Sequence, residues 1–154
     1  MFFDRNRISV RRACWSRDGA ALRWIRSRVF VEEQGVPAKM EWDGLDDSAI
    51  HLIAEDRNGE PIGTARVLAT GQIGRMAVLP GWRHRGAGSM LLTETLRIAM
   101  TERLPNPWLH AQIGACPFYR RHHFTPVGSE FYEAGIAHRR MVYAGQWRLP
   151  AGKP

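Results

Sequence analysis

The sequence lacks the marks of several protein classes. Its 154 residues include only two cysteines, Cys14 and Cys116, far apart and without a Cys-x-x-Cys pattern. This argues against a disulfide scaffold or a multi-cysteine zinc module, and predicts two buried free thiols. No run approaches the roughly 18 apolar residues of a membrane-spanning helix. The first residues carry charges where a signal peptide would be apolar, so we expect a cytoplasmic protein.

Linkers, internal repeats and low-complexity segments are also missing. At 44% hydrophobic and 24% charged residues, the composition is that of a globular domain. A chain of this length is expected to fold around one core. We therefore predict a single domain over residues 1–148 and a loose C-terminal tail over residues 149–154.

Lysine is scarce, because 20 of the 22 basic residues are arginine, and the formal net charge is +7. A basic surface can attract nucleic acids, anionic membranes or phosphorylated small molecules. The arginines are spread along the chain without a long basic run. Charge alone therefore does not choose among these partners.

The hydrophobic pattern alternates between strand and helix periods. Strands are expected over 8–13, 50–56, 62–68, 72–79, 108–112, 127–132 and 139–144. Helices are expected from a cap at Ser16 or Asp18 to about Val31, over 86–103 and over 115–122. Asn58-Gly59 predicts a hairpin, and residues 34–47 read as a loop. The order predicts a mixed α/β (α+β) domain with one central sheet.

The most informative segment joins the strand that ends at Leu79 to the next helix. It contains two arginines, a histidine and two glycines within Arg83 to Ser89. Glycine lets backbone amides approach an anion, and a helix N-terminus adds unpaired N–H groups and a positive dipole end. The segment therefore predicts a phosphate or pyrophosphate site. It is neither a Walker A loop, since Ala87 replaces the lysine, nor a Rossmann loop, since Leu91 replaces the third glycine.

Two motifs resemble the GCN5-related N-acetyltransferases (GNAT). The segment Arg83 to Gly88 resembles the Q/R-x-x-G-x-G/A motif, which binds the pyrophosphate of acetyl-coenzyme A. The segment Gln112 to Tyr119 resembles the N-x-x-A-x-x-F-Y element, with glutamine in the asparagine position. Residues 29–34 and 131–138 are similar to the ElaA-like members. The resemblance covers roughly Ile8 to Ala144 and implies a GNAT-like fold, in which a mixed, mostly antiparallel sheet is flanked by helices.

The resemblance also implies an activity. The chain would transfer an acetyl group from acetyl-coenzyme A to a primary amine of a small molecule or protein, and it could form a homodimer. No metal, nucleic acid or membrane partner is expected. Tyr119 would protonate the leaving thiolate. The residues implied to bind the cosubstrate are Met76, Ala77, Val78, Arg83, His84, Arg85, Gly86, Ala87, Gly88, Ser89 and Gln112.

The group that takes the proton of the amine is left open. Many GNAT members carry a glutamate on the strand before the glycine loop, but residues 72–75 hold no carboxylate. The candidates are Glu32, Glu33, His51 and His138. Four loop carboxylates could attract a cationic substrate or form a solvated loop: Glu41, Asp43, Asp46 and Asp47.

Two further points are open at this stage. His123 stands where many members have a glycine before phenylalanine, which puts the local turn in doubt.

Two other functions fit the same motifs. One is an acyltransferase of this fold with another acyl donor or product, as in the acyl-homoserine lactone synthases. The other is a non-catalytic module that binds coenzyme A or nucleic acid.

Overall fold

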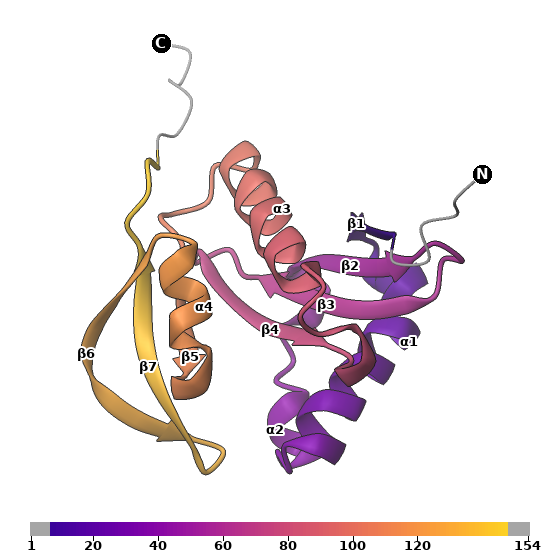
Figure 1. Cartoon of the computed structure of the whole chain (residues 1–154), viewed down its shortest axis with the longest axis horizontal. Coiled ribbons are helices and arrows are strands. Elements are labelled where there is room, and N and C mark those ends of the chain that lie inside the picture. The colour runs from indigo at the N-terminus through magenta and orange to yellow at the C-terminus, as the bar shows by residue number, and fades with distance from the viewer. Residues whose placement is uncertain (1–6, 148–154) are drawn as a thin grey trace.

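The computed structural model describes residues 7–147, which build one seven-stranded sheet with helices on both faces (Figure 1). The strands are β1 (Ile8–Ala13), β2 (Ile50–Asp56), β3 (Pro61–Val67), β4 (Gln72–Val78), β5 (Trp108–Gln112), β6 (Phe124–Glu133) and β7 (Ile136–Tyr143). Their order is β1-β2-β3-β4-β5-β7-β6. Neighbours are antiparallel except β4 and β5, which are parallel. The predicted mixed, mostly antiparallel architecture is confirmed.

Four α-helices accompany the sheet in the described part of the chain. They are α1 (Trp15–Arg26), α2 (Ala38–Glu41), α3 (Ala87–Thr101) and α4 (Cys116–Arg121). After Arg26 the chain continues as a π-helical segment, η1 (Ser27–Glu33). Helix α3 packs on the strands from β1 to β4, and α4 packs on β5 and β6. Figure 1 shows α3 and α1 on opposite sides of the β2–β4 region.

The alternation of side chains along β2 explains why both faces need a helix. Leu52 and Ala54 pack in one buried cluster with Leu91 of α3. Ile53 points to the other face and packs with Leu22 of α1. Successive side chains of a strand point to opposite faces, so a strand buried on both faces must lie between two layers. The middle of the sheet is therefore enclosed by α1 and α3.

The first helix differs from its prediction. Cys14 occupies the N-cap position of α1, with no side-chain cap. Asp18 lies inside the helix, and its carboxylate accepts a hydrogen bond from the Cys14 N–H at 2.8 Å. The helical path ends at Glu33 rather than near Val31, because η1 extends it. Residues 34–47 are also not a plain loop, since α2 forms within them.

Both cysteines are free, as predicted, but Cys14 is exposed and Cys116 only half-buried, so the prediction of two buried thiols is wrong. The predicted C-terminal tail, residues 149–154, lies outside the described residues. Across residues 7–147, no helix is both long and apolar enough to cross a membrane.

Candidate functional site

Strands β4 and β5 separate soon after they meet. They pair only through their first two residues, at Gln72–Trp108 and Ile73–Leu109. Beyond that point β4 keeps its other neighbour, β3, up to Val78. Within the described sheet, the edge of β4 over residues 76–78 therefore has no strand partner (Figure 1). Such an edge offers backbone N–H and C=O groups that an extended ligand with amide groups can pair with.

Arg75 bends β4 just before this open edge. Its φ of 50° lies in the left-handed region, which is uncommon for a residue other than glycine. The pairing of β3 with β4 shifts register at the same place. The Arg75 guanidinium lies 3.1 Å from the carboxylates of both Glu41 and Asp43. The bend is therefore anchored to the segment around α2.

Glu41 and Asp46 belong to a buried ionic network. The side chain of Arg26 is fully buried and contacts the carboxylates of Glu41 and Asp46, each at 2.7 Å. Glu41 is 3% exposed and Asp46 is 8% exposed. Burial raises the pKa of Glu41 despite its arginine neighbours. For these two carboxylates the interpretation as a solvated loop is wrong, because both are buried and paired with an arginine.

Arg66 of β3 completes this network. Its guanidinium lies 2.7 Å from Asp43 and 3.1 Å from Asp46. Although burial opposes ionisation of Asp43, the hydrogen bonds from Arg66 hold the pKa of that carboxyl at about 2. Asp47, the fourth loop carboxylate, is exposed. The network joins α1, α2, β3 and β4 on one side of the open edge.

Gly86 forms the N-cap of α3 with a φ of 89° and no side-chain cap. A Cβ atom built there would meet nothing within 4 Å, so the space before the helix N-terminus is open. His84 also has a positive φ, 62°, and Ala87 in the first turn is 1% exposed. At Gly88 a Cβ would touch the ring of Phe118 at 3.4 Å. The first turn of α3 is thus packed against α4, while its N–H groups have no side-chain cap.

Arg83 has internal partners that the loop sequence does not indicate. Its Nη atoms donate to the two carboxylate oxygens of Glu33 at 2.7 and 2.5 Å, and its Nε donates to the Val78 carbonyl at 2.9 Å. The loop before α3 is therefore tied to η1 and to the end of β4. The hydrogen bonds from Arg83 lower the pKa of Glu33, which makes that carboxylate a weaker base. The structure does not favour Glu33 as the proton acceptor.

A hollow of about 640 Å³ opens beside this ion pair. It is lined by Trp24, Arg28, Glu32, Glu33, Leu79, Pro80, Gly81 and Trp82. Glu32 lies 3.7 Å from Arg28, so both carboxylates of the hollow have arginine partners. The charges compensate one another, and the hollow presents no excess of either sign to a ligand.

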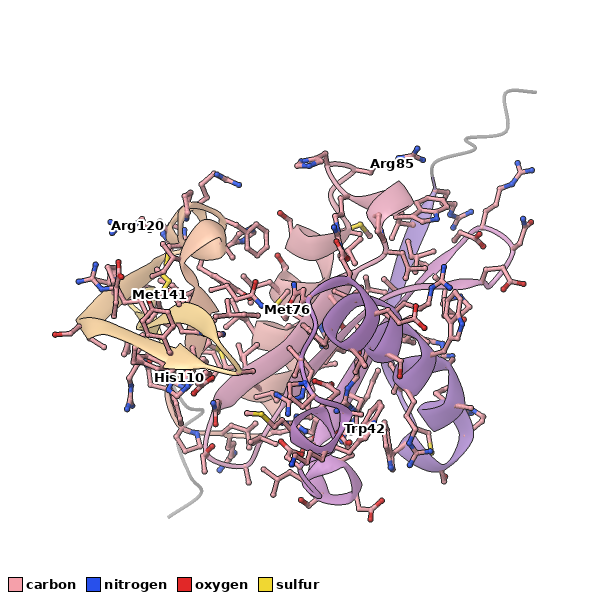
Figure 2. All side chains as sticks on the ribbon, turned by 90° about the horizontal axis from the view of Figure 1, so that it is seen from below. Trp42, Met76, Arg85, His110, Arg120 and Met141 are labelled. Carbon is pink, nitrogen blue, oxygen red and sulfur yellow. The ribbon has the colours of Figure 1, made fainter. Side chains whose placement is uncertain are left out.

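Ser89 and Arg85, at the two ends of the glycine-containing turn, contact different neighbours. The hydroxyl of Ser89 is 2.9 Å from Nε2 of His122, which links the first turn of α3 to the end of α4. The Arg85 guanidinium stacks over Trp82, 5.1 Å from the ring centre. In Figure 2, Arg85 lies at the upper right of the molecule and Arg120 at the upper left. The loop before α3 and helix α4 thus each present an exposed arginine.

Tyr119 of α4 reaches the open edge of β4. Its hydroxyl donates to the Met76 sulfur at 3.5 Å, and Met76 lies near the centre of the view in Figure 2. A thioether is a weak acceptor, so the proton of this hydroxyl is only weakly engaged. Burial raises the pKa of Tyr119, which keeps the phenol protonated. His123 adopts a φ of 69°, so the turn after α4 forms in the left-handed conformation that glycine favours.

Gln112 borders the opening on the β5 side. Its amide donates to the side-chain oxygen of Gln34 at 2.8 Å, which links the end of β5 to the residue after η1. The sequence motif located Gln112, but not Gln34, because the two residues are 78 positions apart. No local pattern could have indicated this contact.

His51 lies in the core rather than at the opening. It is 2% exposed, and its ring stacks on Trp15 with 4.6 Å between centroids. Its Nε2 donates to the Asp46 carbonyl at 2.8 Å, and burial lowers the pKa of the ring. On β2, two strands away from β4, it does not face the open edge. Over residues 7–147, no three histidine, cysteine or acidic side chains gather as metal ligands would.

Comparison with known proteins agrees with this architecture. The family model of the acetyltransferase (GNAT) domain matches residues 15–144. The chain is 32% identical over 123 residues to the uncharacterized N-acetyltransferase YjcF of Bacillus subtilis, which covers 77% of this chain and 87% of that protein. The structure of an acyl-CoA N-acyltransferase from Pseudomonas aeruginosa is 30% identical, with a TM-score of 0.78 over 90% of this chain and 99% of that one. Escherichia coli ElaA is 26% identical, with a TM-score of 0.78 over 88% and 99% of the two chains. This chain therefore belongs to the GNAT family of acetyltransferases.

Proposed function

We propose that this enzyme transfers an acetyl group from acetyl-coenzyme A to a primary amine. The observation that carries the proposal is the open edge of β4, which has the Tyr119 hydroxyl beside it and leads towards the uncapped N-terminus of α3. An extended thioester with a diphosphate at one end fits these features in order. The acyl-coenzyme A N-acyltransferase among the similar structures supports the same class of donor.

The cosubstrate would lie along this path. Amide groups of the pantetheine arm would pair with the backbone of Met76, Ala77 and Val78, as an added strand does. The diphosphate would accept hydrogen bonds from the N–H groups of the first turn of α3, at Ala87, Gly88 and Ser89. The positive φ of Gly86 turns the chain there without a side chain in the way. His84 and Arg85 would add positive charge, while Arg83 holds the loop in place through Glu33.

The reaction follows from this placement. The amine nitrogen attacks the thioester carbon, and a backbone N–H on the β4 edge stabilises the developing oxyanion. The carbon–sulfur bond then breaks, and Tyr119 donates its proton to the sulfur, which leaves as the thiol. A phenol has a reference pKa of roughly 10 and a thiol one of roughly 8.5, and burial raises the pKa of Tyr119 further, so the phenol holds its proton until the thiolate develops. The proton of the amine must pass to a base, because an alkylamine has a pKa near 10.4.

Two measurements test this function. Coenzyme A at a hundredfold excess over its dissociation constant should stabilise the fold by about 2.7 kcal/mol, a shift of roughly 5–10 °C in the melting temperature. NADH, which carries a diphosphate but no pantetheine, is the control and should do much less. Acetyl-coenzyme A mixed with spermidine, tyramine and Nα-acetyl-lysine should then release free thiol. No shift at millimolar coenzyme A would contradict the proposal.

A further inference from the structure

We propose that His138 is the base that takes the proton of the acceptor amine, and that the amine approaches on the face of the sheet opposite Tyr119. This inference rests on the function proposed above. It is carried by the position of His138 across from Gln112, by the faces of β5 and β7, and by the hydrogen bond that fixes the imidazole.

The pairing of β5 with β7 places His138 next to the strand that borders the opening. Strands β4 and β5 pair only at Gln72–Trp108 and Ile73–Leu109 and then separate, so Gln112, the last residue of β5, borders the opening. Gln112 is in turn the direct cross-strand partner of His138 on β7. Directly opposed side chains in an antiparallel pair have Cβ atoms about 4.5–5.5 Å apart. His138 is therefore one strand away from the opening, beside the end of β5.

Tyr119, the proposed acid, and His138, the proposed base, are on opposite faces of the sheet. Leu109 and Ala111 of β5 and Met141 of β7 belong to the buried cluster against which Tyr119 packs. Side chains alternate along a strand, so Gln112 and His138 lie on the opposite face. A thioester held at the opening would have Tyr119 on one side and His138 on the other. This arrangement lets the amine attack from one face while the sulfur leaves toward the other.

A backbone hydrogen bond fixes the tautomer of the His138 imidazole. Its Nδ1 lies 2.7 Å from the Ile136 carbonyl. A carbonyl oxygen can only accept a hydrogen bond, so Nδ1 carries the proton and Nε2 of the neutral ring carries the lone pair. The ring stacks on Phe131 at 6.0 Å between centroids, and His138 is 8% exposed. The ring is thus fixed, and among the described residues Nε2 has no hydrogen-bond partner.

The protons balance over one turnover. Nε2 of His138 removes one proton from the amine nitrogen, directly or through one water, as the nitrogen–carbon bond forms. Tyr119 gives one proton to the sulfur as the carbon–sulfur bond breaks. The imidazolium then releases its proton to solvent, and the phenolate takes one back. No oxidant, reductant or metal is needed for these steps.

His110 provides a matched control on the same face. Its ring contacts Phe131 edge-on, 4.8 Å between centroids, as the ring of His138 also contacts Phe131. His110 precedes Gln112 by two residues and pairs across the sheet with Arg140, so it lies further from the opening. Its Nδ1 is 2.7 Å from the carboxylate of Glu133. Replacing His110 changes the packing around Phe131 without removing the proposed base.

The experiment compares His138→Gln with His110→Gln. Glutamine can still donate to the Ile136 carbonyl but cannot take a proton. Turnover with an alkylamine from the panel above should fall by about 100-fold or more in His138→Gln and change little in His110→Gln. The KM for acetyl-coenzyme A should stay unchanged in both variants. Transfer to hydroxylamine, which is neutral at pH 7 and does not need to be deprotonated before it attacks, should fall far less.

A second variant separates proton transfer from structure. In His138→Ala, added imidazole should restore turnover in proportion to its concentration, because the small base can occupy the vacated space. Two results would overturn the inference. One is an equal loss of turnover in His110→Gln and His138→Gln. The other is that imidazole does not rescue His138→Ala and that turnover with hydroxylamine falls as much as turnover with the alkylamine. A wild-type enzyme that neither binds coenzyme A nor releases thiol would instead overturn the proposed function.

Discussion

Replacing Tyr119 by phenylalanine removes one hydroxyl and leaves the ring packing intact. The hydroxyl has a single weak partner, the Met76 sulfur at 3.5 Å. A neutral hydrogen bond contributes about 0.5–1.5 kcal/mol net, so Tyr119→Phe should lower the free energy of unfolding by about 1 kcal/mol or less. In a domain of this size the melting temperature would drop by no more than about 4 °C. Structure alone thus predicts a small effect on stability.

The effect on catalysis should be much larger. General-acid catalysis contributes about 10²–10⁴-fold, so kcat with a working amine should fall by that factor, or by about 3–5 kcal/mol of barrier. Because burial raises the pKa of Tyr119, the wild-type phenol stays protonated and able to donate at neutral pH. The matched control is Tyr143→Phe, since Tyr143 packs on the same Phe124 ring from β7. A kcat for Tyr119→Phe within threefold of wild type, measured where chemistry limits the rate, would refute this role.

Further predictions concern the loop and the ionic network. Gly86→Val puts a β-branched residue at a φ of 89° and should weaken coenzyme A binding at least tenfold by calorimetry, whereas Gly81→Ala should not. Arg83→Ala and Glu33→Gln should weaken coenzyme A binding to a similar extent, and their effects should not add, because each variant releases the same loop. A loss of affinity in Arg83→Ala alone would indicate that Arg83 contacts coenzyme A directly. Burial opposes ionisation of Asp43, yet its arginine partners hold its pKa at about 2, below the ordinary value of about 3.9. Stability in urea should therefore fall as pH drops from about 4 to 2, and Asp43→Asn should flatten that dependence; an unchanged slope would contradict it.

Local patterns predicted much of the fold. The alternation of apolar residues predicted β1, β2 and β5 with the bounds that the structure has. The loop before α3 and the helix α4, which carries Tyr119, also lie in the predicted order. Each of these signals depends on spacings of a few residues. The left-handed turn at His123 shows the limit of such patterns, because a residue other than glycine forms this turn.

Contacts between distant residues could not be predicted in this way. Arg83 and Glu33 are 50 positions apart, and nothing in the loop sequence indicates that its arginine has an internal partner. Likewise, the alternation in β2 places His51 on the face opposite Leu52. It does not indicate that α1 covers that face and buries His51. The buried charges around Arg26 follow from the same folding of α1 and α2 onto the sheet.

A crystal structure with acetyl-coenzyme A tests the central claim most directly. The account predicts pantetheine amides paired with residues 76–78 of β4, and a diphosphate at the N–H groups of the first turn of α3. It also predicts the thioester sulfur at hydrogen-bond distance, about 3–3.5 Å, from the Tyr119 hydroxyl. Acetyl-coenzyme A bound instead in the hollow between Trp24 and Trp82, with the edge of β4 unoccupied, would contradict it.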